Sequence, residues 1–302
     1  MPTPMPALSL AAVPGRRNTI LELSGEIERR GFTDIYCPSL GDCTALCEAL
    51  AFNTKTIRFG TSIAPIYSRH ALDYAQTAAF IHEVSGGRFS FGVGISHGPT
   101  HDRLGITPGK PLADTRAFVQ AYRGAERVGD KPPLVLAALR QRMIRLAGEL
   151  ADGMVFANGA RSHMATSLAA LPEARRASGD FYIGNMIPTC ISDEEAAAMA
   201  VNRRTLQHYA LLPNYRNYWK EAGYVEEMEA VEAAVAAGEP ERIPECLSDR
   251  WLADTTLFGS VARVREGVEA WFEAGIKTPI LVPSSAAGNQ LTAFEEIFTA
   301  FS

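Results

Sequence analysis

The sequence predicts an α/β protein, a parallel (β/α)8 TIM barrel that forms one domain over residues 1–302. Short apolar runs and helical patterns alternate about eight times along the chain, as barrel units do. The apolar run that ends at Ile95 is typical of a strand buried on both faces of a parallel sheet. An open dinucleotide-binding sheet would need a glycine fingerprint after its first strand, where this chain has only Pro14 and Gly15.

Composition and charge narrow the class of protein. Of 302 residues, 47% are hydrophobic and 21% charged, which is typical of a soluble globular chain. The 29 basic and 34 acidic residues leave a net charge of −5 without a basic stripe, so nucleic acid is not an expected partner. No apolar run approaches the roughly 20 residues that span a bilayer, and no export signal is evident. Five cysteines, an odd number, suit a reducing compartment, so we expect a cytoplasmic protein without a membrane partner.

The first half of the chain alternates strands and helices in barrel order. The apolar run 7–13 ends at Pro14, and the helical period of residues 20–30 ends at Gly31, because proline and glycine interrupt regular structure. The same patterns predict strand 34–38, helix 44–53, strand 56–65, helix 71–84 and strand 88–95.

The second half continues the alternation after an expected long loop at 96–111. Its predicted elements are helix 112–123, strand 133–138, helix 141–150, strand 154–158, strand 181–191, helix 261–274 and strand 278–283. Between the seventh and eighth of these strands, residues 192–259 form a mostly helical insertion. Its tyrosines and tryptophans fit either an aromatic lid over a ligand or helix packing against the barrel.

The fourth predicted strand carries the most informative pattern, SGGRFSFGVGISHGPT from Ser85 to Thr100. At the end of this strand, glycines alternate with other residues and leave few side chains, and polar residues follow. These are the glycines Gly92, Gly94 and Gly98 and the polar residues His97, Thr100 and His101. Chemistry on parallel α/β folds lies at the carboxyl ends of the strands, so a flat or anionic ligand would approach the backbone here. The alternative is that the glycines only ease tight strand packing.

Cys37, Cys43 and Cys47 cluster in the sequence, and the last two are one helical turn apart. A zinc-type site needs a second pair of ligands at a suitable spacing, and none follows. We therefore expect no metal and interpret the three as small thiols of the core or of a pocket wall.

Six stretches spread over nearly the whole chain occur in a characteristic order. They are GFTDIY from Gly31, IRFGTSIAPIYSRH from Ile57, SGGRFSFGVG from Ser85, RLAGELADG from Arg145, LPNYRNYW from Leu212 and EAGI from Glu273. The set resembles the bacterial luciferase-like family of flavin and deazaflavin oxidoreductases. The run RHALDYAQTAAFIHEVSGG is similar to members that use the deazaflavin coenzyme F420. The resemblance implies a homodimeric TIM-barrel enzyme with F420 as cofactor, or FMN as the alternative.

Deazaflavin-using members of that family have a non-prolyl cis peptide in a bulge at the end of the third strand, where it backs the coenzyme ring. The resemblance places this bulge at Thr61, Ser62 and Ile63, with the cis bond between Ser62 and Ile63. A regular strand end is the alternative from the residues alone.

After the fourth strand, the resemblance implies that Gly94, Ile95, Ser96 and Thr100 line the cofactor. His97 stands where similar sugar-phosphate dehydrogenases have a carboxylate that accepts a proton. An imidazole that titrates near neutrality can do the same, so His97 is the candidate catalytic residue. The alternative is a histidine on a surface loop.

After the fifth strand, the family receives the cofactor phosphate on an Ala-Gly-Gly turn at a helix N-terminus. The matching residues here are Ala138, Leu139, Arg140 and Gln141. Free amides and the helix dipole favour an anion there, and Arg140 adds a positive charge. Leu139 and Arg140 replace the two glycines, and their side chains narrow the space through which the phosphate would approach the backbone.

This chain departs from the family pattern at two further positions that bear on proton transfer and substrate binding. Many deazaflavin members have an Asp-His pair at the end of the second strand, where this chain has Ser39 and Leu40. Leucine transfers no protons, so the acid or base would be His97, with His101 or His70 next in order. Similar enzymes bind sugar phosphate with a lysine. The matching position here, near Ala160, has no lysine, which disfavours a sugar-phosphate substrate.

The sequence hypothesis is an F420-dependent oxidoreductase that moves a hydride between the coenzyme and a small organic substrate. Its first alternative is an FMNH2-dependent monooxygenase on the same barrel. Its second is a barrel that binds the cofactor without turnover, which the residues at Leu40, Leu139 and Arg140 would favour.

Overall fold

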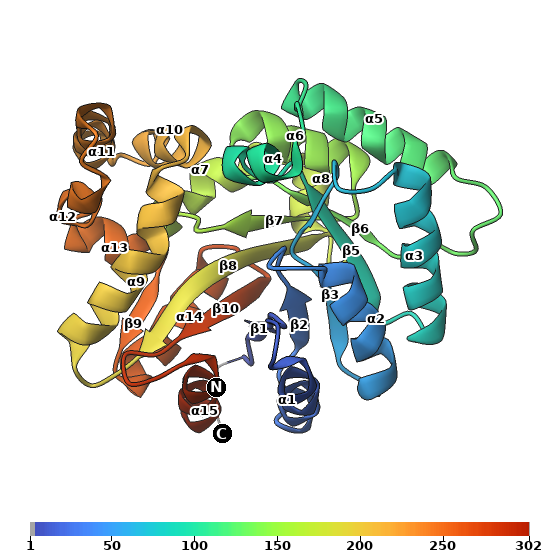
Figure 1. The fold of residues 1–302 in the computed structure, drawn as a ribbon, viewed down its shortest axis with the longest axis horizontal. Coiled ribbons are helices and arrows are strands. Elements are labelled where there is room, and N and C mark those ends of the chain that lie inside the picture. Colours follow the sequence, from blue (N-terminus) through green and yellow to red (C-terminus); the bar gives the residue numbers. More distant parts are fainter. Residues whose placement is uncertain (1–3, 302) are drawn as a thin grey trace. The chain divides into compact units, whose positions relative to one another are not determined.

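Strands and helices alternate along residues 4–301, the part of the chain that the computed structural model describes (Figure 1). The chain divides into two units. The N-terminal unit consists of Met5–Phe156 and Ala169–Gly184, and the C-terminal unit includes residues 157–168 and 185–301.

Parallel strands in chain order make up the sheet of the N-terminal unit. They are β1 (Ala7–Ser9), β2 (Asp34–Cys37), β3 (Arg58–Thr61), β5 (Phe89–Gly94), β6 (Leu134–Ala137) and β7 (Gly153–Ala157, whose last residue belongs to the C-terminal unit). The short β4 (Ala64–Pro65) also pairs with β5. Because all of these pairings are parallel, the carboxyl ends of neighbouring strands meet at one edge.

Helices connect these strands, as βα units require (Figure 1). They are α1 (Arg17–Arg29), α2 (Cys43–Asn53), α3 (Ala71–Val84), α4 (Gly98–Leu104), α5 (Pro111–Gly124), α6 (Gln141–Leu150) and α8 (Glu173–Ala177). The core between α3, α5 and β5 is aromatic: Tyr74 lies 5.3 Å from Phe91 and 5.9 Å from Phe118 between ring centroids.

In the C-terminal unit, β8 (Tyr182–Ile191, whose first three residues belong to the N-terminal unit) pairs with β9 (Leu257–Gly259) and with β10 (Thr278–Ser284). Its helices are α7 (Met164–Leu168), α9 (Glu195–Ala210), α10 (Pro213–Glu221), α11 (Val225–Ala237), α12 (Ile243–Cys246), α13 (Asp249–Thr255), α14 (Val261–Glu273) and α15 (Gln290–Ala300). Figure 1 shows α9 and α13 next to β9, with α10, α11 and α12 further from that strand.

Aromatic side chains pack the helices of the expected insertion against one another. Tyr218, Trp219 and Trp251 are fully buried, and the two indole rings meet edge to face at 4.8 Å. Of the two uses considered for these aromatic residues, the structure shows helix packing for these three.

The observed elements differ from the predicted ones in several places, and α7, α8 and α15 were not predicted at all. The expected loop 96–111 contains α4, a helix of only seven residues with Pro99 in its first turn; Gly105, with a φ of 64°, follows its last residue. The predicted strand 56–65 is divided into β3 and β4 by the bulge at residues 62–63. The three-residue β9 lies within the predicted insertion, where its length was too short for a periodic signal. No helix among residues 4–301 is long and apolar enough to cross a membrane.

The strand glycines are packed against neighbouring segments. A Cβ on Gly92 would collide with the carbonyl oxygen of Thr61, and one on Gly94 would lie 2.8 Å from the Cβ of Ala137. A Cβ on Gly98 would meet no atom within 4 Å. Tight strand packing therefore accounts for Gly92 and Gly94, and only Gly98 is open.

We predict that Gly92→Ala lowers the free energy of unfolding by about 1–3 kcal/mol, because the backbone of β3 or β5 must move to admit the methyl group. Gly98→Ala, at the first position of α4, is the matched control and should leave stability unchanged or slightly raised. Urea unfolding of both variants measures the difference. Equal stabilities would contradict the packing argument.

Candidate functional site

The sequence predicts three cofactor-binding segments, and each of them directly follows one of a set of neighbouring strands in the N-terminal unit. The register pairs Ala64 with Val93 and Val93 with Leu136. Hence the bulge after β3, the segment after β5 and the turn after β6 meet at the carboxyl edge of the sheet. This edge is where α/β barrels place their chemistry.

The bulge has the predicted cis peptide between Ser62 and Ile63. The Thr61 hydroxyl donates to the Gly92 carbonyl at 2.7 Å and accepts from the Gly92 amide at 2.9 Å. The Ser62 amide donates to the Cys37 carbonyl at 2.8 Å. Thr61 and Ser62 are both buried. The bulge is thus hydrogen-bonded to the strands on both of its sides.

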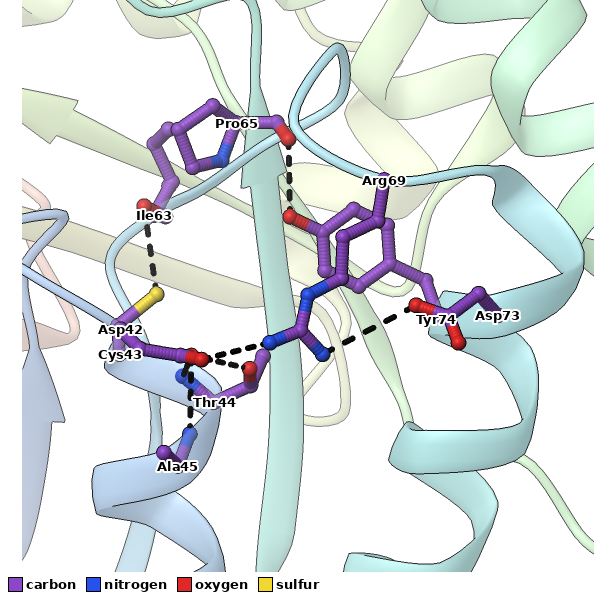
Figure 2. Close-up of polar contacts among 9 residues, drawn as sticks. All are labelled: Asp42, Cys43, Thr44, Ala45, Ile63, Pro65, Arg69, Asp73 and Tyr74. Carbon is purple, nitrogen blue, oxygen red and sulfur yellow. Dashed lines mark hydrogen bonds and ion pairs between the residues drawn. The ribbon is translucent and has the colours of Figure 1, made fainter.

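A polar network joins the bulge to the starts of α2 and α3 (Figure 2). The Cys43 thiol donates to the Ile63 carbonyl at 3.9 Å, and the Tyr74 hydroxyl donates to the Pro65 carbonyl at 3.0 Å. Burial, with smaller contributions from Cys37 and Asp42, raises the pKa of Cys43 to about 12, so it remains a thiol that can donate.

Asp42 and Arg69 link α2 to the segment before α3. The Asp42 carboxylate caps α2 by accepting from the amides of Thr44 and Ala45, both at 3.1 Å, and it pairs with Arg69 at 2.6 Å. Figure 2 shows the Arg69 guanidinium between Asp42 and Asp73. Burial raises the pKa of Asp42, but the hydrogen bonds from Thr44 and Ala45 and the charge of Arg69 outweigh it, so the pKa is lowered overall.

After β5 the chain turns sharply and starts α4. Ser96 has a φ of 62°, and His97 is the residue before the helix. The ring Nε2 of His101 is 2.6 Å from the Ile95 carbonyl. Since a carbonyl only accepts hydrogen bonds, Nε2 carries the proton. This bond ties α4 back to the end of β5 and fixes the Ile95–His97 segment.

Tyr67 and Asp114, which were not among the predicted site residues, also stabilise this region. The Tyr67 ring meets His101 edge to face at 5.3 Å, and its hydroxyl donates to Asp114 at 2.6 Å. Asp114 also accepts from the Gly109 amide at 2.9 Å. Sequence reasoning missed this group because Tyr67 and Asp114 are 47 positions apart in the chain and Asp114 lies in none of the quoted stretches.

His97 is half-buried, so it is not a freely exposed loop residue. Burial, and to a lesser extent the nearby charge of His101, lowers its pKa from the ordinary 6.5. The imidazole is therefore neutral at pH 7 and has a lone pair that can accept a proton. His70, by contrast, is exposed and caps α3 by accepting from the Leu72 amide at 3.2 Å.

The turn after β6 leads directly into α6. Arg140 is exposed, and its carbonyl accepts from the amides of Met143 and Ile144 at 2.9 and 3.1 Å. The Ala138 amide donates to the Val155 carbonyl at 3.0 Å, so it does not point to a ligand. The anion-binding capacity of this turn thus rests on Leu139–Gln141 at the helix N-terminus and on the Arg140 guanidinium.

Leu40, which stands in place of a family histidine, is 67% exposed after the end of β2. Its amide donates to the Pro38 carbonyl at 2.8 Å. An exposed leucine offers apolar contact and no proton transfer. Of the histidines in the described chain, His97 and His101 lie next to the predicted cofactor-binding segments.

Comparisons with known proteins cover almost the whole chain. A family model described as luciferase-like monooxygenase matches residues 7–278. A "Putative coenzyme F420-dependent oxidoreductase" of Mycobacterium tuberculosis is 26% identical over 88% of this chain and 90% of its own length. The 5,10-methylenetetrahydromethanopterin reductase of Methanolobus tindarius is 29% identical over 42% of this chain, and the match spans only 46% of that relative.

The structural comparison settles the fold class. The coenzyme F420 dependent tetrahydromethanopterin reductase from Methanopyrus kandleri superposes with a TM-score of 0.76 over 98% of each chain, at 16% sequence identity. At this identity the likeness shows the fold alone. It confirms the predicted parallel eight-stranded barrel with surrounding helices.

We predict that Asp42→Ala lowers the free energy of unfolding by about 1 kcal/mol through loss of the α2 cap. Asp42→Asn is the matched control, because its amide oxygen still caps the helix while the charge opposite Arg69 is lost. We expect it to cost about 0.5 kcal/mol, as an exposed ion pair does.

The pH dependence of this pair follows from the lowered pKa of Asp42. A depressed pKa contributes stability above the ordinary value of 3.8, and this contribution is lost as pH falls through the folded value. Wild type and Asp42→Asn should therefore converge in stability below pH 3.8. A gap that stays constant to pH 2 in urea titrations would contradict a role for the charge.

Proposed function

Because the chain belongs to the luciferase-like monooxygenase family, we propose that it is an F420-dependent oxidoreductase that transfers a hydride between the coenzyme and a small organic substrate. The likeness to the Mycobacterium tuberculosis relative carries this proposal, since it extends over 88% of the chain. The match to the 5,10-methylenetetrahydromethanopterin reductase spans only 46% of that relative, which is too little to indicate the substrate.

The residues at the carboxyl edge of the sheet fit both the ring and the phosphate of such a coenzyme. The Ser62–Ile63 backbone and Ile95–Ser96 lie on adjacent segments, where a flat ring would bind between them. Arg140 and the start of α6 offer a positive charge and a helix N-terminus to a phosphate. The deazaflavin ring, when bound, supplies the hydride chemistry.

His97 is the proposed proton acceptor. Its lowered pKa keeps the ring neutral at pH 7, and it directly follows the Ile95–Ser96 segment. The His101 bond to Ile95 holds the backbone that carries it. Leu40 leaves the position of the family's histidine without a titratable group, so no second acid or base is proposed there.

The alternative is an FMNH2-dependent monooxygenase, which the description of the matching family model favours. The same edge and the same α6 terminus would bind the ring and phosphate of FMN. Dependence of turnover on oxygen separates the two functions. A protein that bound neither cofactor would overturn both.

We predict that F420 quenches the intrinsic fluorescence of the protein with low-micromolar affinity and that FMN binds more weakly. Arg140→Ala should weaken F420 binding about 10-fold, as loss of a charge-assisted phosphate contact does. Arg145→Ala is the control, since Arg145 lies one turn further along α6 and donates to Gln141. Equal effects of the two substitutions would remove Arg140 from the phosphate site.

A second prediction concerns His97. Single-turnover hydride transfer in the wild type should slow as pH falls below 6.5, because protonation at the lowered pKa removes the acceptor lone pair. His97→Ala should be slower by about 100-fold or more and lose this pH dependence. The control His70→Ala removes an exposed helix cap and should retain the wild-type profile. An unchanged profile in His97→Ala would exclude His97 as the base.

A further inference from the structure

A series of contacts in the N-terminal unit connects the start of α5 to the segment that carries His97. The Asp114 carboxylate accepts from the Tyr67 hydroxyl at 2.6 Å, and the Tyr67 ring meets the His101 ring at 86°, with 5.3 Å between the ring centroids. The His101 Nε2 donates to the Ile95 carbonyl at 2.6 Å. Because Ile95 comes two residues before His97, the series ends at the backbone of the proposed proton acceptor.

The backbone around Tyr67 sets the position of its ring. The amide of the preceding residue, Ile66, donates to the Gly94 carbonyl at 2.9 Å, next to the pairing of Pro65 with Gly94. These contacts place Tyr67 beside the end of β5. Burial, and to a lesser extent the hydrogen bond to Asp114 and the charge of that residue, raise the pKa of Tyr67. The hydroxyl therefore keeps its proton and donates it to the carboxylate.

The Asp114 carboxylate also binds the loop between α4 and α5. Its Oδ2 atom accepts from the Gly109 amide at 2.9 Å as well as from the Tyr67 hydroxyl. The Asp114 amide in turn donates to the Lys110 carbonyl at 2.9 Å. Both donors to Oδ2 are uncharged, so the amide oxygen of an asparagine at this position would accept the same two bonds.

His101, which is 7% exposed, holds a strained turn. Ser96 lies between Ile95 and His97 and has a φ of 62°, a left-handed value that costs free energy in a residue other than glycine. Such a conformation persists only where the surrounding structure fixes it. The amides of Thr100 and His101 also donate to the His97 carbonyl, at 3.0 and 3.1 Å. Contacts from α4 therefore hold the backbone on both sides of Ser96.

We propose that Tyr67 and Asp114 are positioning residues for His97, which act through the ring of His101 and touch neither substrate nor coenzyme. The bond to Asp114 fixes the Tyr67 ring, and this ring keeps the His101 imidazole on the Ile95 carbonyl. Without that support the imidazole can turn away, and the strained turn can relax. This role rests on the proposed function, because a proton acceptor needs a fixed distance and angle to its donor.

The first test observes the histidine rings in the whole protein without coenzyme. Protein with 15N- and 13C-labelled histidine gives ring signals, which His97→Ala and His101→Phe assign by their disappearance. Tyr67→Phe keeps the aromatic ring and removes only the hydroxyl, whereas Asp114→Ala removes the acceptor. Asp114→Asn is the conservative variant, because it retains an acceptor oxygen.

Tyr122→Phe is the matched control for the loss of a phenol hydroxyl. Tyr122 lies on α5, as Asp114 does, and is 1% exposed. Its hydroxyl has no hydrogen-bond partner among the described residues. A general effect of removing a tyrosine hydroxyl from this part of the unit would appear in the control as well.

We expect the His101 Nε2 proton to exchange with solvent about 3- to 10-fold faster in Tyr67→Phe and Asp114→Ala, as loss of one hydrogen bond from the series implies. The His97 ring signals should shift in the same two variants, and Asp114→Asn and Tyr122→Phe should match the wild type. Unchanged His97 signals in Tyr67→Phe, or equal changes in Tyr122→Phe, would overturn the proposal. This measurement needs neither coenzyme nor turnover, so its failure is distinct from failure of the proposed function.

A kinetic test then connects the two residues to the reaction. Hydride transfer in Tyr67→Phe should slow about 3- to 10-fold, with F420 affinity and KM unchanged. In the His97→Ala background the same substitution should have no further effect, because residues that act through one another are not additive. An equal slowing in that background would show that Tyr67 does not act through His97. Loss of F420 affinity would assign Tyr67 to coenzyme binding, and either result would overturn the positioning role.

Discussion

The reciprocal hydrogen bonds between Thr61 and Gly92 are the constraint on which the candidate site depends. The threonine hydroxyl both donates to and accepts from the glycine backbone, at 2.7 and 2.9 Å. This close approach of β3 and β5 leaves no space for a Cβ on Gly92. It sets the bulge after β3 against the end of β5, and so determines which backbone atoms a ligand meets at this edge.

The bulge after β3 and the segment after β5 carry no formal charge of their own and are hydrogen-bonded to neighbouring segments. Burial keeps Cys43 a thiol and favours the neutral form of His97. The charged groups Asp42 and Arg69 lie at the starts of α2 and α3, where they stabilise helix ends. Such a division is expected where a cofactor carries the redox chemistry, because the protein then has to orient the cofactor and to move protons.

Aromatic packing holds the helices of the C-terminal unit together. Its helices α9–α13 pack around Trp219 and Trp251, which leaves little of their aromatic surface for a mobile lid. Hydrogen bonds add to this packing at Asn158, which follows β7, and at Asn185 on β8. The Asn158 backbone is held by the Met186 carbonyl and the Trp219 indole, and the Asn185 side chain accepts from the Gly159 amide.

Sequence alone determined the alternation of strands and helices, because periodicity and glycine position carry that information locally. The cis peptide at Ser62–Ile63 was implied only by the resemblance to the family, since the residues themselves also fit a regular strand end. Tertiary structure decided what depends on distant pairs: that Gly92 serves strand packing, that Tyr67 and Asp114 hold the His101 segment, and that the Gly159 amide meets Asn185. Contacts between residues 26 to 47 positions apart have no periodic signature, because only the folded register brings those side chains together.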